Sequence, residues 1–322
     1  MGKSTLFNAL TKSYAADAAN FPFCTIEPNI GIVDVKDERI NTLANIYGCT
    51  KLIYAATKFV DIAGLVKGAS TGEGLGNKFL SHIREVDAII QVVRYFDDPD
   101  VVHVHGTINP IYDADIINSE LMIADLDQIQ KQLPQLSKLS KKTREQEQLV
   151  EILSLGSTLL NQGLPLSNLI ADLNPEQVRL LHSQNFLTTK PLIYAVNVAE
   201  SDLVKFGEIE KNLTEQLQKP VIAVSAKLES ELMELDDGDK AEYLKSIFGT
   251  YQGEIPTLDR LIKLAYDTVG LMYYFTSGEK ETKAWSIPVG STAPQAAGAI
   301  HTDFERGFIK AEIVGYTQLI AA

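Results

Sequence analysis

The chain has 322 residues, of which 45% are hydrophobic, and its formal net charge is −13. This length suits one or two domains with an insertion, and the acidic balance excludes nucleic-acid binding over the whole surface, though not at a local basic patch. The sequence contains no run approaching the ~20 apolar residues of a membrane span, no signal-peptide pattern, and only two cysteines. We therefore expect a cytoplasmic protein without a disulfide framework or zinc site.

The first residues match the end of a phosphate-binding loop. Gly2-Lys3-Ser4-Thr5 fits the last part of G-x-x-x-x-G-K-S/T and opens a helix expected over residues 3–12. In a complete loop the backbone N–H groups cradle phosphates, the lysine neutralises the β and γ oxygens, and the serine coordinates Mg²⁺. Four residues can match by chance, so a second nucleotide-binding motif is needed to support this interpretation. The strand and glycine-rich turn that precede such a loop are not in the sequence, and we expect a domain that lacks its N-terminal strand and binds nucleotide weakly.

The partner motif is Asp61-x-x-Gly64, which ends an apolar run expected to form a buried parallel strand over residues 58–62. In nucleotide switches this Asp organises Mg²⁺, and the glycine N–H points at the γ-phosphate. Leu65 stands where Ras-like GTPases carry a water-positioning Gln, so hydrolysis needs help from elsewhere. The neighbouring pattern predicts further elements: a strand at 30–35, a helix at 38–46, a glycine-rich switch at 69–76, a helix ending near 84 and a strand at 88–93.

From about residue 116 the apolar spacing becomes helical. Residues 118–133 and 146–160 carry Leu and Ile every three to four positions, which predicts an antiparallel helical hairpin inserted into an α/β domain. Basic residues near its tip form a run without acidic residues: Lys131, Lys138, Lys141, Lys142 and Arg144. They form either a solvated helical tip or a contact surface for RNA or the ribosome.

Strand and helix patterns then alternate at residues 191–196, 208–217 and 220–224, which favours a doubly wound, mostly parallel sheet. Beyond residue 270, strands at 272–275, 282–287 and 308–314 surround a short helix at 293–300. These segments predict a small α+β domain that ends sooner than such domains usually do.

The strand at 191–196 runs into Asn197-Val198-Ala199-Glu200, where a GTPase carries Asn-Lys-x-Asp. The Asp of that motif accepts two hydrogen bonds from guanine, and adenine offers neither donor. Glu200 and Val198 therefore disrupt the guanine clamp, at ~1–3 kcal/mol for each unsatisfied group. We expect Asn197 to read the edge of adenine and Val198 to pack near its ring, with Ser225 and Ala226 completing the site. An ordinary strand-to-loop turn is the alternative.

Together these segments resemble the YchF family of Obg-like ATPases, within the Obg-type translation-factor GTPases. The matching stretches are residues 18–29, 59–77, 197–200, 293–298 and 301–305. The resemblance implies an α/β P-loop NTPase domain of the OBG type over residues 1–268, with a coiled-coil hairpin at about 114–185. It also implies a β-grasp-like TGS domain, cut short, over residues 271–322.

The resemblance also assigns roles to single residues. Expected nucleotide contacts are Gly2, Lys3, Ser4, Thr5, Gly64, Asn197, Val198, Glu200, Ser225 and Ala226, and expected Mg²⁺ ligands are Ser4, Thr25 and Asp61. His103 matches the family's candidate catalytic histidine. A half-exposed histidine at a strand end is the alternative for His103.

These expectations describe a Mg²⁺-dependent ATPase that prefers ATP over GTP, changes conformation with the γ-phosphate and works with the ribosome. Its intrinsic turnover should be slow, because the sequence shows no arginine finger, a group that contributes ~10³–10⁵-fold. Two other functions stay open: an Obg-like GTPase that tolerates Glu200, and a non-hydrolysing, nucleotide-dependent scaffold that binds ribosome or protein.

Overall fold

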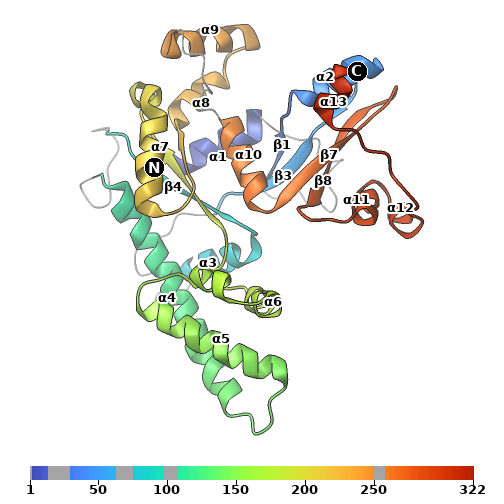
Figure 1. Cartoon of the computed structure of the whole chain (residues 1–322). Coiled ribbons are helices and arrows are strands. Elements are labelled where there is room, and N and C mark those ends of the chain that lie inside the picture. Colours follow the sequence, from blue (N-terminus) through green and yellow to red (C-terminus); the bar gives the residue numbers. More distant parts are fainter. Residues whose placement is uncertain (1, 14–29, 63–74, 98–107, 250–257) are drawn as a thin grey trace. The chain divides into compact units, whose positions relative to one another are not determined.

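The computed structural model describes residues 2–13, 30–62, 75–97, 108–249 and 258–322 (Figure 1). By packing, the chain divides into two compact units. The first unit comprises Met1–Lys3, Asp61–Leu228 and Ala241–Pro256, and the second comprises Ser4–Val60, Glu229–Lys240 and Thr257–Ala322. Within the described ranges, no helix is long and apolar enough to cross a membrane.

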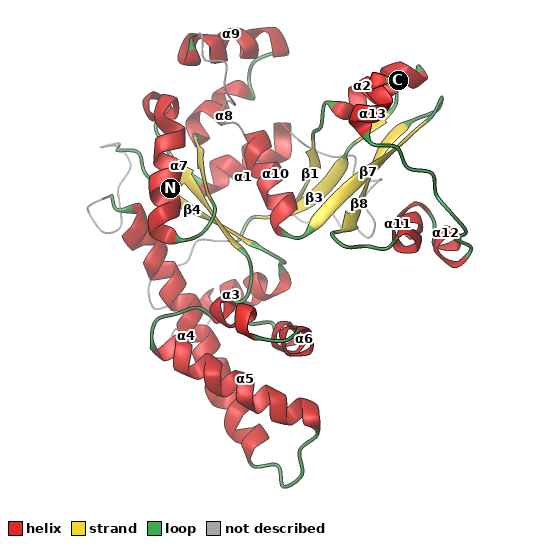
Figure 2. Ribbon diagram, in the orientation of Figure 1, coloured by secondary structure: helices red, strands yellow, loops and turns green. Residues whose placement is uncertain are grey.

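A parallel three-stranded sheet forms the centre of the first unit (Figure 2). Its order is β4 (Ile89–Arg94), β5 (Leu192–Asn197) and β6 (Val221–Val224). The strands are largely buried apolar runs, as expected for parallel strands covered on both faces. The register places Arg94 beside Asn197 and Asn197 beside Val224. The carboxyl ends of all three strands therefore meet at one edge of the sheet.

Helices pack on this sheet from both of its outer strands. Helix α4 (Pro110–Ser137) contacts β4, and its Asn118 donates a hydrogen bond to the Tyr194 hydroxyl at 2.8 Å. The helix begins at Asn109, whose side chain accepts the Tyr112 N–H, and Pro110 follows at the first helical position. Helix α7 (Phe206–Leu217) packs against β6, and α3 (Leu75–Glu85) shares an apolar cluster with α4.

Helices α4 and α5 (Arg144–Asn161) run in opposite directions, and α5 packs against the second half of α4 (Figure 1). Both helices predicted for this segment are confirmed, although α4 starts eight residues earlier than the prediction because Asn109 and Pro110 begin it. Sequence analysis missed the 3₁₀ helix η2 (Leu166–Asp172) and α6 (Pro175–Ser183), which close the same core. That core consists of Ile129, Leu149, Ile152, Leu153, Leu160, Leu166, Leu169, Leu181 and Phe186.

The second unit contains two small sheets. Strand β1 (Ile30–Val35) pairs antiparallel with β3 (Ala55–Val60), while β7 (Leu271–Ser277) pairs antiparallel with β8 (Thr282–Pro288), which also pairs in parallel with β2 (Leu52–Ile53). Helix α10 (Leu258–Thr268) packs on β1 and β7, and α2 (Arg39–Tyr47) packs on β7 and β8. The predicted α/β class is confirmed, and the parallel arrangement is found in β4–β5–β6.

The remaining helices are α1 (Lys3–Ser13), α8 (Ala226–Leu232), α9 (Asp237–Phe248), α11 (Ala293–Ile300), α12 (Thr302–Arg306), α13 (Tyr316–Ala321) and the 3₁₀ helix η3 (Glu200–Lys205). The predicted strand at 308–314 is wrong: its apolar alternation is present, but no described strand pairs with it, and Ile309 is 90% exposed. The predicted strand at 58–62 is displaced, because β3 spans residues 55–60 and ends just before Asp61. The prediction that this strand is buried and parallel is wrong: β3 pairs antiparallel with β1 and is mostly half-buried.

Candidate nucleotide site

Two of the sequence motifs meet in the first unit. The Asp61 carboxylate pairs with the Nζ of Lys3, 58 positions away in the chain. The two side chains are 18% and 33% exposed, so solvent reaches both. A cation of the phosphate-loop type therefore lies against the carboxylate that follows β3.

Gly2, the residue before Lys3, lies against β5. Its φ is +87°, and a Cβ built there would be 2.3 Å from Nδ2 of Asn197 and 3.1 Å from Cβ of Ala226. No side chain fits in this space, and the positive φ also favours glycine. Glycine is thus required for the chain to approach the sheet edge this closely.

Asn197 connects the segments at this edge. Its side chain is 3% exposed, and its Oδ1 accepts the N–H of Ala226 at 2.9 Å. The Tyr95 N–H continues the β4–β5 ladder by donating to the Asn197 carbonyl at 2.9 Å. Asn197 thereby fixes the turn after β6 relative to Gly2. Its predicted contact with adenine remains a prediction.

The other residues predicted to contact the base lie at the same edge and are mostly buried. Val198 is 2% exposed and donates its N–H to Val224 at 2.9 Å. Ser225 is 1% exposed, and its hydroxyl accepts the Leu228 N–H at 3.3 Å in the first turn of α8. Ser4 and Thr5, by contrast, are exposed in the first turn of α1.

Glu200 has partners from two later segments. Its Oε2 accepts from Lys227 Nζ at 2.8 Å, and its Oε1 accepts from the Tyr243 hydroxyl at 3.1 Å. Sequence reasoning missed Tyr243, because nothing in the local pattern of α9 links it to a residue 43 positions earlier.

Arg94 is a second residue that sequence reasoning missed. It ends β4, is 2% exposed and lies beside Asn197 in the ladder. Its Nε donates to the Phe96 carbonyl at 3.0 Å, and its guanidinium lies 4.5 Å from the Phe96 ring centroid. A charged residue directly after an apolar strand was the available signal. These contacts of Arg94 with Phe96 hold the segment that follows β4.

Three predicted site residues, Thr25, Gly64 and His103, lie outside the described residues. Within the part of the chain that the structure describes, no three or more His, Cys, Asp or Glu side chains lie close enough together to hold a metal ion. Mg²⁺ needs no such group, because one or two protein oxygens and the substrate phosphates complete its shell. The Ser4 hydroxyl and the Asp61 carboxylate are hard oxygen donors of the kind that fits this ion.

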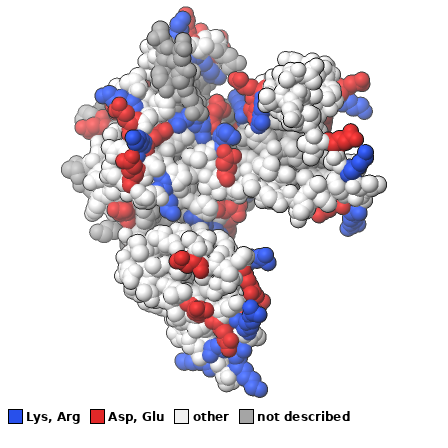
Figure 3. All heavy atoms as spheres, viewed as in Figure 1, with Lys and Arg blue, Asp and Glu red and all other residues white. Residues whose placement is uncertain are grey.

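A separate polar surface lies on the helical pair. The predicted basic residues cluster at the turn between α4 and α5, with Lys131 farther back along α4 (Figure 3). Lys142 donates to the carbonyls of Ser137 and Leu139, both at 3.1 Å, and Arg144 lies 3.8 Å from Glu176. Lys138 and Lys141 are exposed at the turn.

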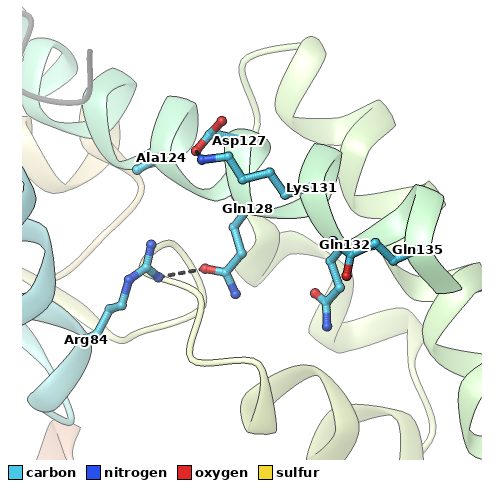
Figure 4. A pocket seen from close by; sticks show the side chains of 7 residues that line it. All are labelled: Arg84, Ala124, Asp127, Gln128, Lys131, Gln132 and Gln135. Atoms are coloured by element: carbon cyan, nitrogen blue, oxygen red, sulfur yellow. Dashed lines mark hydrogen bonds and ion pairs between the residues drawn. The ribbon is translucent and has the colours of Figure 1, made fainter. Parts of the chain in front are cut away.

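Beside Lys131, a cavity of about 450 Å³ opens between the end of α3 and α4 (Figure 4). Its lining is polar apart from Ala124: Arg84, Asp127, Gln128, Lys131, Gln132 and Gln135. Arg84 donates to Gln128 at 2.7 Å, and Lys131 pairs with Asp127 at 2.6 Å. The cavity is lined by residues of α3 and α4, and none of the predicted nucleotide contacts is among them.

Family models match both ends of the chain. A model described as a 50S ribosome-binding GTPase matches residues 1–151, and YchF-GTPase_C, described as a protein of unknown function, matches residues 271–322. The parallel sheet with these residues at its carboxyl edge and the first model define the class: a P-loop GTPase-type α/β domain.

Full-length relatives narrow the class. The Ribosome-binding ATPase YchF of Pasteurella multocida is 45% identical over 99% of this chain and 87% of the relative, and its namesake in Bacillus subtilis is 44% identical over 100% and 87%. The solved YchF GTPase of Schizosaccharomyces pombe superimposes with a TM-score of 0.84 at 37% identity, covering 100% of this chain and 86% of that one. A GTP-binding protein of Pyrococcus horikoshii shares the fold at TM-score 0.56 and 18% identity. The chain belongs to the YchF family.

Proposed function

We propose that this protein is a Mg²⁺-dependent ATPase that associates with the ribosome and switches conformation with the γ-phosphate. The observation that carries the proposal is the meeting of Lys3 with Asp61, close to the buried edge that holds Asn197. The relatives named Ribosome-binding ATPase YchF support both the hydrolysis of ATP and the ribosome as partner.

Lys3 would exchange its pairing with Asp61 for the β and γ oxygens of ATP, with the N–H groups of Gly2, Ser4 and Thr5 on the phosphates. Mg²⁺ held by Ser4, Thr25 and Asp61 would supply charge neutralisation at the phosphates. The Gly64 N–H would hold the γ-phosphate, and loss of that contact on hydrolysis would release the switch.

His103 is proposed to position the attacking water, since Leu65 cannot do so by hydrogen bonding. An imidazole with a pKa of ~6.5 can accept a proton near neutral pH. In this proposal His103→Ala lowers kcat while the Kd of ATP stays nearly constant.

For the base, we propose that Asn197, Val198, Glu200, Ser225 and Ala226 form a site that favours adenine. In outline, the proposed organisation is an OBG-type domain over residues 1–268, a coiled-coil insertion at about 114–185 and a TGS domain over 271–322. The exposed lysines at the turn of the helical pair are the proposed contact with ribosomal RNA.

The test is phosphate release from ATP by the 1–322 chain, measured with Mg²⁺ and with EDTA. Wild type should release phosphate only with Mg²⁺, and Lys3→Met and Asp61→Asn should each lower the rate at least tenfold. Lys211→Met, on the exposed side of α7, is the control and should keep the rate.

Two other functions predict different results. A rate equal to that of buffer in single-turnover assays, with ATP bound, would favour the non-hydrolysing scaffold. A Kd for GTP at least tenfold below that for ATP, about 1.4 kcal/mol in the wrong direction, would favour the GTPase.

A further inference from the structure

We propose that Lys227 and Tyr243 set the base selectivity of this site by holding the carboxylate of Glu200, so that guanine must compete with both residues for its acceptor oxygens. The inference rests on the proposed function, because it concerns the same base site. It assigns a role in specificity to two residues outside the motif that recognises the base.

The geometry occupies both oxygens of the carboxylate. Lys227, from α8, bonds Oε2 at 2.8 Å, and Tyr243, from α9, bonds Oε1 at 3.1 Å. The Glu200 side chain is only 22% exposed, so water has limited access to it. All three residues belong to the first compact unit.

Guanine would need lone pairs of this carboxylate. Its N1–H and 2-amino group require two acceptors, and an ionised carboxylate only accepts, through about four lone-pair sites. Lys227 and Tyr243 already take one site on each oxygen. Binding guanine would add two more donors beside them and weaken both existing bonds, whereas adenine presents no donor at these positions and leaves them intact. The site therefore discriminates by the difference between the free energy of binding guanine, which weakens these bonds, and that of binding adenine, which does not.

Lys227 and Tyr243 should contribute unequally to the base selectivity. The Lys227 side chain is 71% exposed, and ion pairs of exposed lysines contribute little because water screens them. The Tyr243 hydroxyl is part-buried, and a hydrogen bond to a charged group is stronger than one between neutral groups. Tyr243→Phe should therefore shift selectivity more than Lys227→Met.

The experiment measures the Kd of ATP and of GTP for wild type, Tyr243→Phe, Lys227→Met and the double variant. Lys245→Met, an exposed lysine on the same helix α9, is the matched control. We expect the GTP/ATP Kd ratio to fall about tenfold in the double variant and about threefold in Tyr243→Phe, which corresponds to ~1.4 kcal/mol for the double change. The Kd of ATP and the control ratio should stay within twofold of wild type.

Adding Glu200→Gln to the double variant tests whether the gain passes through the carboxylate. The amide replaces one acceptor oxygen with a donor, so the gained GTP affinity should disappear. If the higher GTP affinity persists with Glu200→Gln, the inference is overturned. It is also overturned if wild type prefers ATP but the GTP/ATP Kd ratio stays unchanged in folded Tyr243→Phe and in the folded double variant. A wild type that prefers GTP would overturn both the inference and the proposed function.

Discussion

Gly2 allows the chain to lie directly against the edge of the sheet at Asn197. Gly2→Ala places a Cβ 2.3 Å from the Asn197 amide at φ +87°, so we expect a loss of ~1–3 kcal/mol in stability, together with weaker ATP binding. Gly48→Ala is the matched control: its φ is +67°, but its Cβ meets nothing within 4 Å. Thermal unfolding of both variants separates the clash from the backbone strain, and equal losses would contradict the packing argument.

Glu229 couples folding to pH. It is 4% exposed, and its Oε1 accepts the N–H of Leu258, the first residue of α10, at 2.9 Å. Burial, with a smaller contribution from neighbouring Asp259, raises the pKa of this carboxyl from 4.5 to about 7, although the hydrogen bond from the Leu258 N–H opposes the shift. Between these two pH values the folded state binds more protons than the unfolded state, so stability falls as pH rises and stays low above pH 7.

Glu229→Gln should remove this slope, because the amide keeps an acceptor for Leu258 but does not titrate. The measurement is urea unfolding at pH 5 and pH 8. Wild type should lose on the order of 2 kcal/mol more than the variant between these conditions. The same pH dependence in both proteins would show that Glu229 is not the titrating group.

Among the elements, α5 requires a glycine where it meets its neighbours. A Cβ at Gly156 would lie 2.8 Å from Leu166 and 3.3 Å from Ile129, both in the helical core. Gly156→Ala should destabilise by ~1 kcal/mol, because overpacking outweighs the gain in helix propensity. Gly207→Ala, in α7 with open space around it, should instead stabilise by ~0.5–1 kcal/mol. Chemical denaturation measures the change in the free energy of unfolding for both variants. A stabilised Gly156→Ala would contradict the close contact.

Asp125 fastens α4 to the chain that leads into β5. This carboxylate is fully buried and accepts three hydrogen bonds, from the N–H groups of Leu187 and Thr188, both at 2.8 Å, and from the Thr188 hydroxyl at 2.7 Å. Burial raises the pKa of Asp125 despite these donors. The carboxylate therefore works as a structural acceptor inside the first unit.

Asp125→Ala leaves two N–H groups without their acceptor and should cost ~2–4 kcal/mol in unfolding free energy. Asp125→Asn retains one acceptor oxygen and should cost less. Asp127→Ala, two residues away in an exposed pair with Lys131, is the control and should change stability by under ~0.5 kcal/mol. Similar losses for Asp125→Ala and Asp127→Ala would contradict this role.

Local periodicity predicted most of these elements, since the pattern within a helix or strand depends on which face is buried. It predicted α11 to the residue and β1 likewise. It failed at residues 308–314, because alternation favours a strand only where another strand supplies the ladder. It also missed Tyr243 and Arg94, whose importance depends on partners that local spacing does not specify. Lys3 and Asp61, which pair in the structure, had been singled out because both belong to motifs of fixed chemistry, and their contacts with phosphate and Mg²⁺ remain predictions.

Charge is uneven over the molecule as a whole. Against a net charge of −13, the turn between α4 and α5 exposes Lys138 and Lys141. If this turn contacts ribosomal RNA, Lys138→Ala with Lys141→Ala should weaken ribosome binding. The slope of the logarithm of the binding constant against the logarithm of salt concentration should also become less steep, because about two fewer counterions are released on binding. Co-sedimentation at several salt concentrations measures both quantities, with Lys211→Ala as the control. Unaltered binding by the double variant would place the contact elsewhere.

Helix α4 is one unbroken element of 28 residues that starts after the exit from β4 and ends at the basic turn. At 1.5 Å per residue it is about 42 Å long, and the buried Asp125 clamp holds its middle to the chain entering β5. Because this clamp fixes the middle of the helix, a rotation of roughly 10° about Asp125 moves the end at Ser137, about 18 Å away, by about 3 Å. A tilt of α4 where it contacts β4 would thereby displace the basic turn at the other end of the helix.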